Sequence, residues 1–134
     1  MKAKVIIERG NDGLFSYYMN EKKFDFGLNG QGNTIEEAKN DFFSTYAELK
    51  DMYSEEGKEF SELEFEFEYD ISSFLNYYSG VLSKSGLEKI TGINQKQLWH
   101  YSSGRRKPTK STVEKIQLGL NNFSKELGQV HFVD

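Results

Sequence analysis

Hydrophobic and polar residues alternate in short runs along the first half of the chain, which is the period of strands with one buried face. Three such runs cover residues 4–7, 15–19 and 24–28, and Asn11-Asp12-Gly13 supplies a tight turn between the first two. The most regular run has Leu63, Phe65, Phe67 and Tyr69 on one face and Glu62, Glu64, Glu66 and Glu68 on the other. The pattern predicts four strands, the last with one face in water.

A helical period separates the third and fourth runs. Thr34-Ile35-Glu36-Glu37 has the form of a capping box, in which a threonine hydroxyl and a glutamate carboxylate satisfy the first turn of a helix. Apolar residues then recur at three- and four-residue spacing, at Ile35, Ala38, Phe42, Leu49 and Tyr53. One long helix ending near Glu56 is predicted.

From Asp70 onward the apolar spacing is helical as far as Leu127. Asp70 can cap a helix whose inner face is Ile71, Phe74, Leu75 and Tyr78. The last helix is expected to begin at Thr109 or Ser111 and to turn one stripe inward, formed by Val113, Ile116, Leu120, Phe123 and Leu127. Residues 130–133 alternate again and predict a short terminal strand.

The segment between residues 84 and 108 predicts two short helices that cross. Gly92 supplies the left-handed backbone that ends the first helix, and Asn94 can cap the second. A small core is expected from Leu87, Ile90, Ile93, Leu98 and Tyr101. The opposite face of the second helix is left outside.

That outer face has the side chains for reading DNA in the major groove, where glutamine can pair with adenine and lysine can donate to guanine. The candidate base-reading residues are Gln95, Lys96, Trp99, His100 and Ser103. The candidate phosphate-binding residues are Lys84, Asn94, Arg105, Arg106, Lys107 and Lys110.

The charge distribution also divides the chain. Residues 1–70 hold 17 acidic and 8 basic side chains, a net charge of −9, whereas residues 71–134 hold 4 acidic and 9 basic ones, a net charge of +5. A basic module concentrates at a polyanion, whereas an acidic one suits a basic protein partner. We therefore expect two modules, residues 1–70 and 71–134.

The glutamates of residues 62–68 invite comparison with nucleases, which use clustered carboxylates to hold metal ions. Four carboxylates on one strand face, about 7 Å apart, diverge along a line instead. We therefore interpret them as a solvated edge or as the surface that binds a basic partner. Gly27, Gly30 and Gly32 lack the lysine and hydroxyl residue of a phosphate loop, which favours a turn.

Other classes of function have no support in the sequence. No segment approaches the about 20 apolar residues of a membrane span, and the first residues do not form a signal-peptide core. The chain has no cysteine and two histidines, so neither a catalytic triad nor a zinc site is indicated. We expect a cytoplasmic protein that is not an enzyme and has no metal or cofactor.

The segment from Gly92-Ile93-Asn94-Gln95 to Tyr101, with Gly104-Arg105-Arg106-Lys107-Pro108 after it, resembles the helix-turn-helix of the Cro and phage-repressor family. The resemblance covers roughly residues 87–120. Glu88 stands where the family usually has a small residue, and Thr91 replaces a core aliphatic. The resemblance implies binding to double-stranded operator DNA, as a dimer on a palindrome.

The first module resembles the HicB-type antitoxins in Val5-Ile6-Ile7-Glu8, in Gly13-Leu14-Phe15-Ser16 and in the stretch from Gly30 to Ala38. Phe26-Gly27-Leu28-Asn29-Gly30 replaces the family's usual Pro-Leu-Pro-Gly-Cys-like segment. This resemblance implies a partial ribonuclease-H-like fold of strands, one long helix and a closing strand. It also implies an antitoxin that blocks a small, basic, HicA-like ribonuclease toxin, forms a homodimer or higher even oligomer, and represses its own operon.

The expected fold class is therefore α+β: a partial ribonuclease-H-like sheet with one long helix, followed by an all-α helix-turn-helix domain with a short terminal strand. The alternative function is a stand-alone transcriptional regulator whose first module dimerises or senses a ligand.

Overall fold

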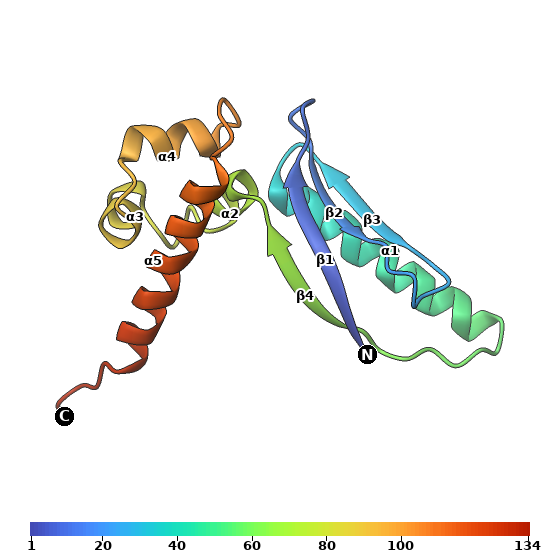
Figure 1. Ribbon diagram of the computed structural model, residues 1–134. Coiled ribbons are helices and arrows are strands. Elements are labelled where there is room, and N and C mark those ends of the chain that lie inside the picture. Colours follow the sequence, from blue (N-terminus) through green and yellow to red (C-terminus); the bar gives the residue numbers. More distant parts are fainter. The chain divides into compact units, whose positions relative to one another are not determined.

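A hairpin begins the computed structural model, which describes residues 1–134 (Figure 1). Strands β1 (Lys2–Arg9) and β2 (Phe15–Met19) pair antiparallel, and the turn between them lies at the predicted residues. Gly13 has a φ of 85°, and the Asp12 carboxylate accepts a hydrogen bond of 3.0 Å from the Leu14 amide. Such a backbone favours glycine because a side chain is strained there.

The third strand lies later in the sequence than predicted. β3 (Leu28–Gly32) pairs antiparallel with β2, whereas residues 24–27 form no strand. The predicted glycine turn is therefore wrong, because Gly30 and Gly32 belong to this strand. A Cβ atom on Gly30 would lie 2.3 Å from the Phe42 amide nitrogen, so glycine lets the strand touch the backbone of the long helix.

That helix, α1 (Ile35–Glu55), covers one face of the sheet (Figure 1). Its predicted N-cap is confirmed, because the Thr34 hydroxyl accepts a hydrogen bond of 3.1 Å from the Glu37 amide. The Glu37 carboxylate reaches back to the Asn33 amide, at 2.9 Å. Ile35, Ala38 and Phe42 are buried against the sheet.

Strand β4 (Glu64–Tyr69) follows α1 and pairs parallel with β1, which gives the sheet order β3-β2-β1-β4. The core lies between the sheet and α1 and includes Val5, Ile7, Tyr17, Met19 and Phe42. On the opposite face, alternate residues of every strand are open to solvent.

Helix α2 (Ile71–Tyr77) packs on the same sheet, and its N-cap is the predicted Asp70. One Asp70 oxygen accepts a hydrogen bond from the Ser73 amide, at 2.8 Å, and the other accepts one from the Arg9 amide, at 2.9 Å. Residue contacts divide the chain into an N-terminal unit, Met1–Tyr77, and a C-terminal unit, Tyr78–Asp134. The division therefore falls after Tyr77 and not after Asp70, because Asp70 and α2 are bonded to the sheet.

The C-terminal unit contains three helices, α3 (Lys84–Thr91), α4 (Gln95–Ser102) and α5 (Lys110–Gly128). Ser83, Asn94 and Thr109 cap them, each through a side-chain oxygen that accepts from a backbone amide. The buried residues of this unit are Leu87, Thr91, Leu98, Tyr101 and Ile116. With five helices and one four-stranded mixed sheet, the expected α+β class is confirmed.

Two expectations for the end of the chain are wrong. The C-terminal half of α5 extends past α3 and α4, so the apolar stripe is not buried along its length (Figure 1). Leu127 is exposed in that half, and Val113, near the start of the helix, is exposed as well. Residues 130–133 form no strand, because the unit is helical and offers no sheet edge for their backbone groups. None of the helices is both long and apolar enough to traverse a lipid bilayer.

Candidate nucleic-acid interface

The turn between α3 and α4 is built from Thr91, Gly92 and Ile93. Gly92 has a φ of 77°, and its amide donates to the Glu88 carbonyl at 2.7 Å, which ends α3. The buried Thr91 hydroxyl donates to the Leu87 carbonyl at 2.7 Å and accepts from the Ile93 amide at 3.1 Å. Thr91 is thus a hydrogen-bonding residue of this turn, which an aliphatic side chain could not replace.

The first turn of α4 has two caps, one of which the sequence did not reveal. The Asn94 side-chain oxygen accepts from the Gln97 amide at 2.9 Å, as predicted. The Glu88 carboxylate, which comes from α3, accepts from the Gln95 amide at 2.9 Å. A negative charge is favourable at a helix N-terminus, so Glu88 ties α3 to α4.

One face of α4 is buried and the other is open. Leu98 and Tyr101 are buried, and the Gln97 side-chain amide donates to the Tyr101 hydroxyl at 2.9 Å. Of the candidate base-reading residues, Gln95, Lys96, Trp99 and Ser103 are exposed, and Trp99 retains 48% of its surface. His100 is half-buried, and its Nδ1 atom is enclosed without a hydrogen-bond partner. Four of the five thus lie where a ligand can reach them.

Positive charge gathers around His100. Its pKa lies below the ordinary value of 6.5, first because of burial and then because of Arg106, Arg105 and Lys96. None of these three cations has an ion-pair partner, since the ion pairs of the protein involve other residues. The outer face of α4 and the loop after it therefore carry uncompensated positive charge.

The loop after α4 places most of the candidate phosphate-binding residues in solvent. Gly104 has a φ of 77°, and the Arg106 amide donates to the His100 carbonyl at 3.2 Å. Four of the candidates follow this turn in exposed positions, namely Arg105, Arg106, Lys107 and Lys110. Lys84, half-buried, is at the start of α3, and Asn94 has its side-chain oxygen committed to capping α4.

Helix α5 supports this surface through a close contact with α3. A Cβ atom on Gly119 would lie 2.5 Å from the Ile90 carbonyl oxygen and 3.0 Å from the Thr91 Cα atom. Glycine is about 1 kcal/mol less favourable than alanine inside a helix, so its presence here is explained by the contact. Gly119 therefore sets how closely α5 approaches the end of α3.

The candidate partner-binding glutamates do not form one uncompensated row. Lys2 pairs with Glu66 at 3.4 Å and Lys4 with Glu68 at 3.1 Å, on the open face of the sheet. Glu62 precedes β4 and instead meets Lys50 and the Tyr46 hydroxyl of α1. Of the four glutamates, Glu64 alone has no cationic partner, and the partner-binding role of the row stays a prediction.

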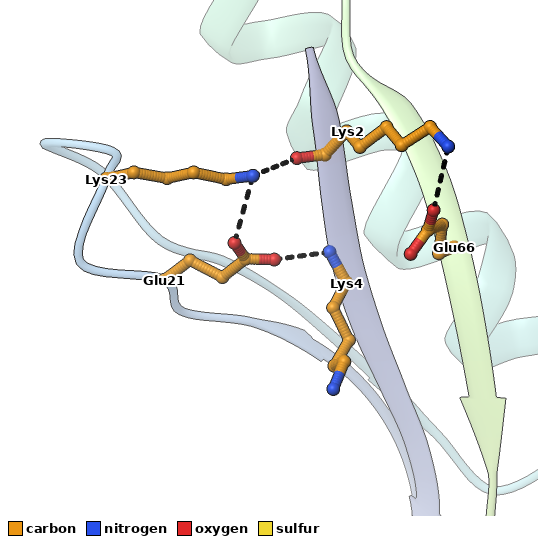
Figure 2. A network of polar contacts seen from close by, with 5 residues as sticks. All are labelled: Lys2, Lys4, Glu21, Lys23 and Glu66. Carbon is orange, nitrogen blue, oxygen red and sulfur yellow. Dashed lines mark hydrogen bonds and ion pairs between the residues drawn. The ribbon is translucent and has the colours of Figure 1, made fainter.

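Figure 2 shows how the same face is tied to the loop after β2. The Glu21 carboxylate accepts from the Lys4 amide and pairs with Lys23 at 3.3 Å, while the Lys23 ammonium donates to the Lys2 carbonyl. The backbone hydrogen bond lowers the pKa of Glu21. Side chains thus satisfy the backbone of β1 at the end where β2 no longer pairs with it.

Other kinds of site have little support. No three or more His, Cys, Asp or Glu side chains are grouped so that they could hold a metal ion. A cavity of about 170 Å³ is present in the N-terminal unit, lined by Met1, Phe24, Phe26, Tyr53, Glu59, Phe60, Ser61 and Leu63.

Comparisons with protein-family models, curated proteins and solved structures found no match for this chain.

Proposed function

We propose that the C-terminal unit is a helix-turn-helix domain that binds double-stranded DNA with α4 in the major groove. The observation that best supports this proposal is the outer face of α4. There, Gln95, Lys96 and Trp99 are exposed and lie among cations that no carboxylate neutralises. A groove-reading helix needs such a face, with its inner side buried and its N-terminal residues free to reach base edges.

The proposed roles follow from position. Gln95 and Lys96 stand at the start of α4 and read bases, assisted by Trp99, His100 and Ser103. Arg106, Lys107 and Lys110, together with Lys84, bind phosphates and set the register. Asn94 acts mainly as the cap of α4.

A selection from a random duplex library, followed by affinity measurements, tests these roles with the full chain. Gln95→Ala should relax the base preference at one position, by about 1 to 3 kcal/mol, whereas Arg106→Ala should weaken binding to every duplex. Lys125→Ala, at the far end of α5, is the charge-matched control and should change neither. Equal losses on selected and random DNA for Gln95→Ala and Arg106→Ala would refute the division of roles.

We further propose that the protein is a cytoplasmic antitoxin, not an enzyme, that blocks a small basic ribonuclease toxin and represses its own operon as a homodimer. Three strands, a long helix and a closing strand occur in the order that the HicB resemblance implies for a partial ribonuclease-H-like domain. The N-terminal unit also has 17 acidic and 8 basic side chains, a net charge of −9, which favours a basic partner.

Co-expression with the product of the neighbouring reading frame tests the antitoxin proposal. Relief of that protein's toxicity is expected, and the N-terminal unit should be required for it. A toxic neighbour that stays toxic would exclude the antitoxin role and favour a stand-alone regulator. A monomer at concentrations that saturate operator DNA would exclude the dimer.

A further inference from the structure

The chain's one tryptophan is held in place on the outer face of α4. The guanidinium carbon of Arg105 lies 5.4 Å from the centroid of the Trp99 ring, over its face. The His100 ring packs edge-on against the indole, with centroids 5.3 Å apart and an angle of 65° between the planes. Two neighbours therefore orient the indole while 48% of its surface remains exposed.

The cation–π contact with Trp99 distinguishes Arg105 from Arg106. A cation–π contact uses the charge of the guanidinium and not its N–H donors, which keep the planar fork that matches two acceptors. No carboxylate is paired with this group. Arg106 has no such ring contact among the cation–π pairs of the protein. Arg105 is thus directed onto the outer face of α4, next to Trp99.

We propose that Trp99 and Arg105 read two adjacent base pairs as one unit, a thymine through its 5-methyl group and a guanine through O6 and N7. This inference rests on the proposed DNA binding and assigns Arg105 to base recognition, although the sequence alone favours a phosphate contact. The thymine methyl is an apolar group in the major groove, and paired bonds to O6 and N7 are the commonest arginine contact there.

The charges around Trp99 favour DNA over a second protein copy as its occupant. Lys96, Arg105 and Arg106 act on the same neighbourhood, since each lowers the pKa of His100. A two-fold interface would bring the same surface of a second chain against it, so cations would face cations. A polyanion gains from this arrangement instead.

Modified bases test the inference with the full chain. A duplex is first selected from a random library, and each of its thymines is then replaced by deoxyuridine and each guanine by 7-deazaguanine, one at a time. One deoxyuridine should weaken binding about fourfold, the effect of one buried carbon. A 7-deazaguanine at the adjacent pair should weaken it about tenfold.

Three variants assign these effects to residues. Trp99→Ala, at an exposed site, should lose the deoxyuridine effect, and Arg105→Ala should lose the 7-deazaguanine effect because alanine has no donor for guanine N7. Arg106→Ala is the matched control, which should bind every duplex more weakly but keep both effects. Circular dichroism verifies that each variant is folded.

The outcomes distinguish a failure of this inference from a failure of the proposed DNA binding, on which it rests. Binding that is insensitive to every deoxyuridine, or an Arg105→Ala variant that keeps the full 7-deazaguanine effect, would overturn the joint base reading by Trp99 and Arg105 and leave DNA binding intact. Failure of the unmodified chain to bind any duplex at low salt would overturn both.

Discussion

Charged side chains behave differently on the two polar surfaces of this protein. On the open face of the sheet, Lys2 and Lys4 pair with Glu66 and Glu68. On the outer face of α4, Lys96, Arg105 and Arg106 have no carboxylate partner and lower the pKa of His100. Exposed ion pairs contribute little to the free energy of unfolding, and the paired side chains leave little net charge at that place for a partner. Unpaired like charges repel one another, and an anionic ligand relieves that repulsion.

The largest expected effect comes from a substitution that destabilises the N-terminal unit and leaves the C-terminal unit unchanged. Gly30→Val should destabilise the N-terminal unit by at least about 3 kcal/mol, because the new side chain would overlap the α1 backbone. Urea denaturation measures the loss. Gly27→Ala is the control, since its Cβ would meet only the Met19 carbonyl, at 3.4 Å. A Gly30→Val protein as stable as the original would mean that β3 does not touch α1 as described.

The second largest effect concerns the support beneath the α4 surface. Gly119→Ala should destabilise the C-terminal unit by about 1 to 3 kcal/mol, although alanine is the better helix former, because its Cβ would overlap the Ile90 carbonyl. DNA affinity should fall with it. Gly128→Ala, in the last turn of the same helix, meets nothing within 4 Å and should be neutral or slightly stabilising. Equal stability of the two variants would contradict the contact.

A smaller effect is expected when one cation is removed from each surface and DNA binding is compared. Arg106→Ala should weaken DNA binding and reduce the slope of log K against log salt concentration by about 1, since one phosphate contact is lost. Lys4→Ala removes the exposed pair with Glu68 and should leave DNA binding unchanged, with a stability loss of about 0 to 1 kcal/mol. If Lys4→Ala changed the salt slope as Arg106→Ala does, the contrast between the two surfaces would disappear.

The smallest effect is a pH dependence. The folded pKa of His100 lies below 6.5, so the unfolded chain takes up a proton first and the C-terminal unit should lose stability as pH falls below 6.5. Bound phosphates would screen Arg106, Arg105 and Lys96 and raise the pKa of His100, so DNA affinity should rise as pH falls. Nuclear magnetic resonance titration of the imidazole, without and with DNA, measures the pKa of His100 in each state. A pKa of His100 that DNA leaves unchanged or lowers would contradict the proposed interface.

Local patterns predicted much of the fold. The hairpin turn, the Thr34 and Asn94 caps, the left-handed Gly92 and strand β4 each depend on neighbours in the sequence. The true position of β3 was not predictable, because it depends on Gly30 meeting the α1 backbone. The prediction of a strand at residues 130–133 was wrong for the same kind of reason, because the alternation of apolar and polar residues does not reveal whether a neighbouring strand is available for pairing.

The candidate site shows the same division. The exposed face of α4 followed from helical spacing, and Gln95, Lys96, Trp99 and Ser103 lie on it. The cap from Glu88 and the cation–π contact of Arg105 with Trp99 depend on how separate segments approach one another in the fold. The pairing of Lys2 and Lys4 with glutamates was missed because it requires the parallel register of β1 and β4.

Intrinsic fluorescence tests the central claim most directly, because Trp99 is the one tryptophan in the chain and lies on the proposed DNA-binding face. Titrating the full chain with duplex DNA at low salt should change the intensity or wavelength of its emission, and added salt should reverse the change. Emission that stays constant while duplex DNA binds would contradict the placement of α4 in the groove, and a chain that binds no duplex would contradict the proposed function itself.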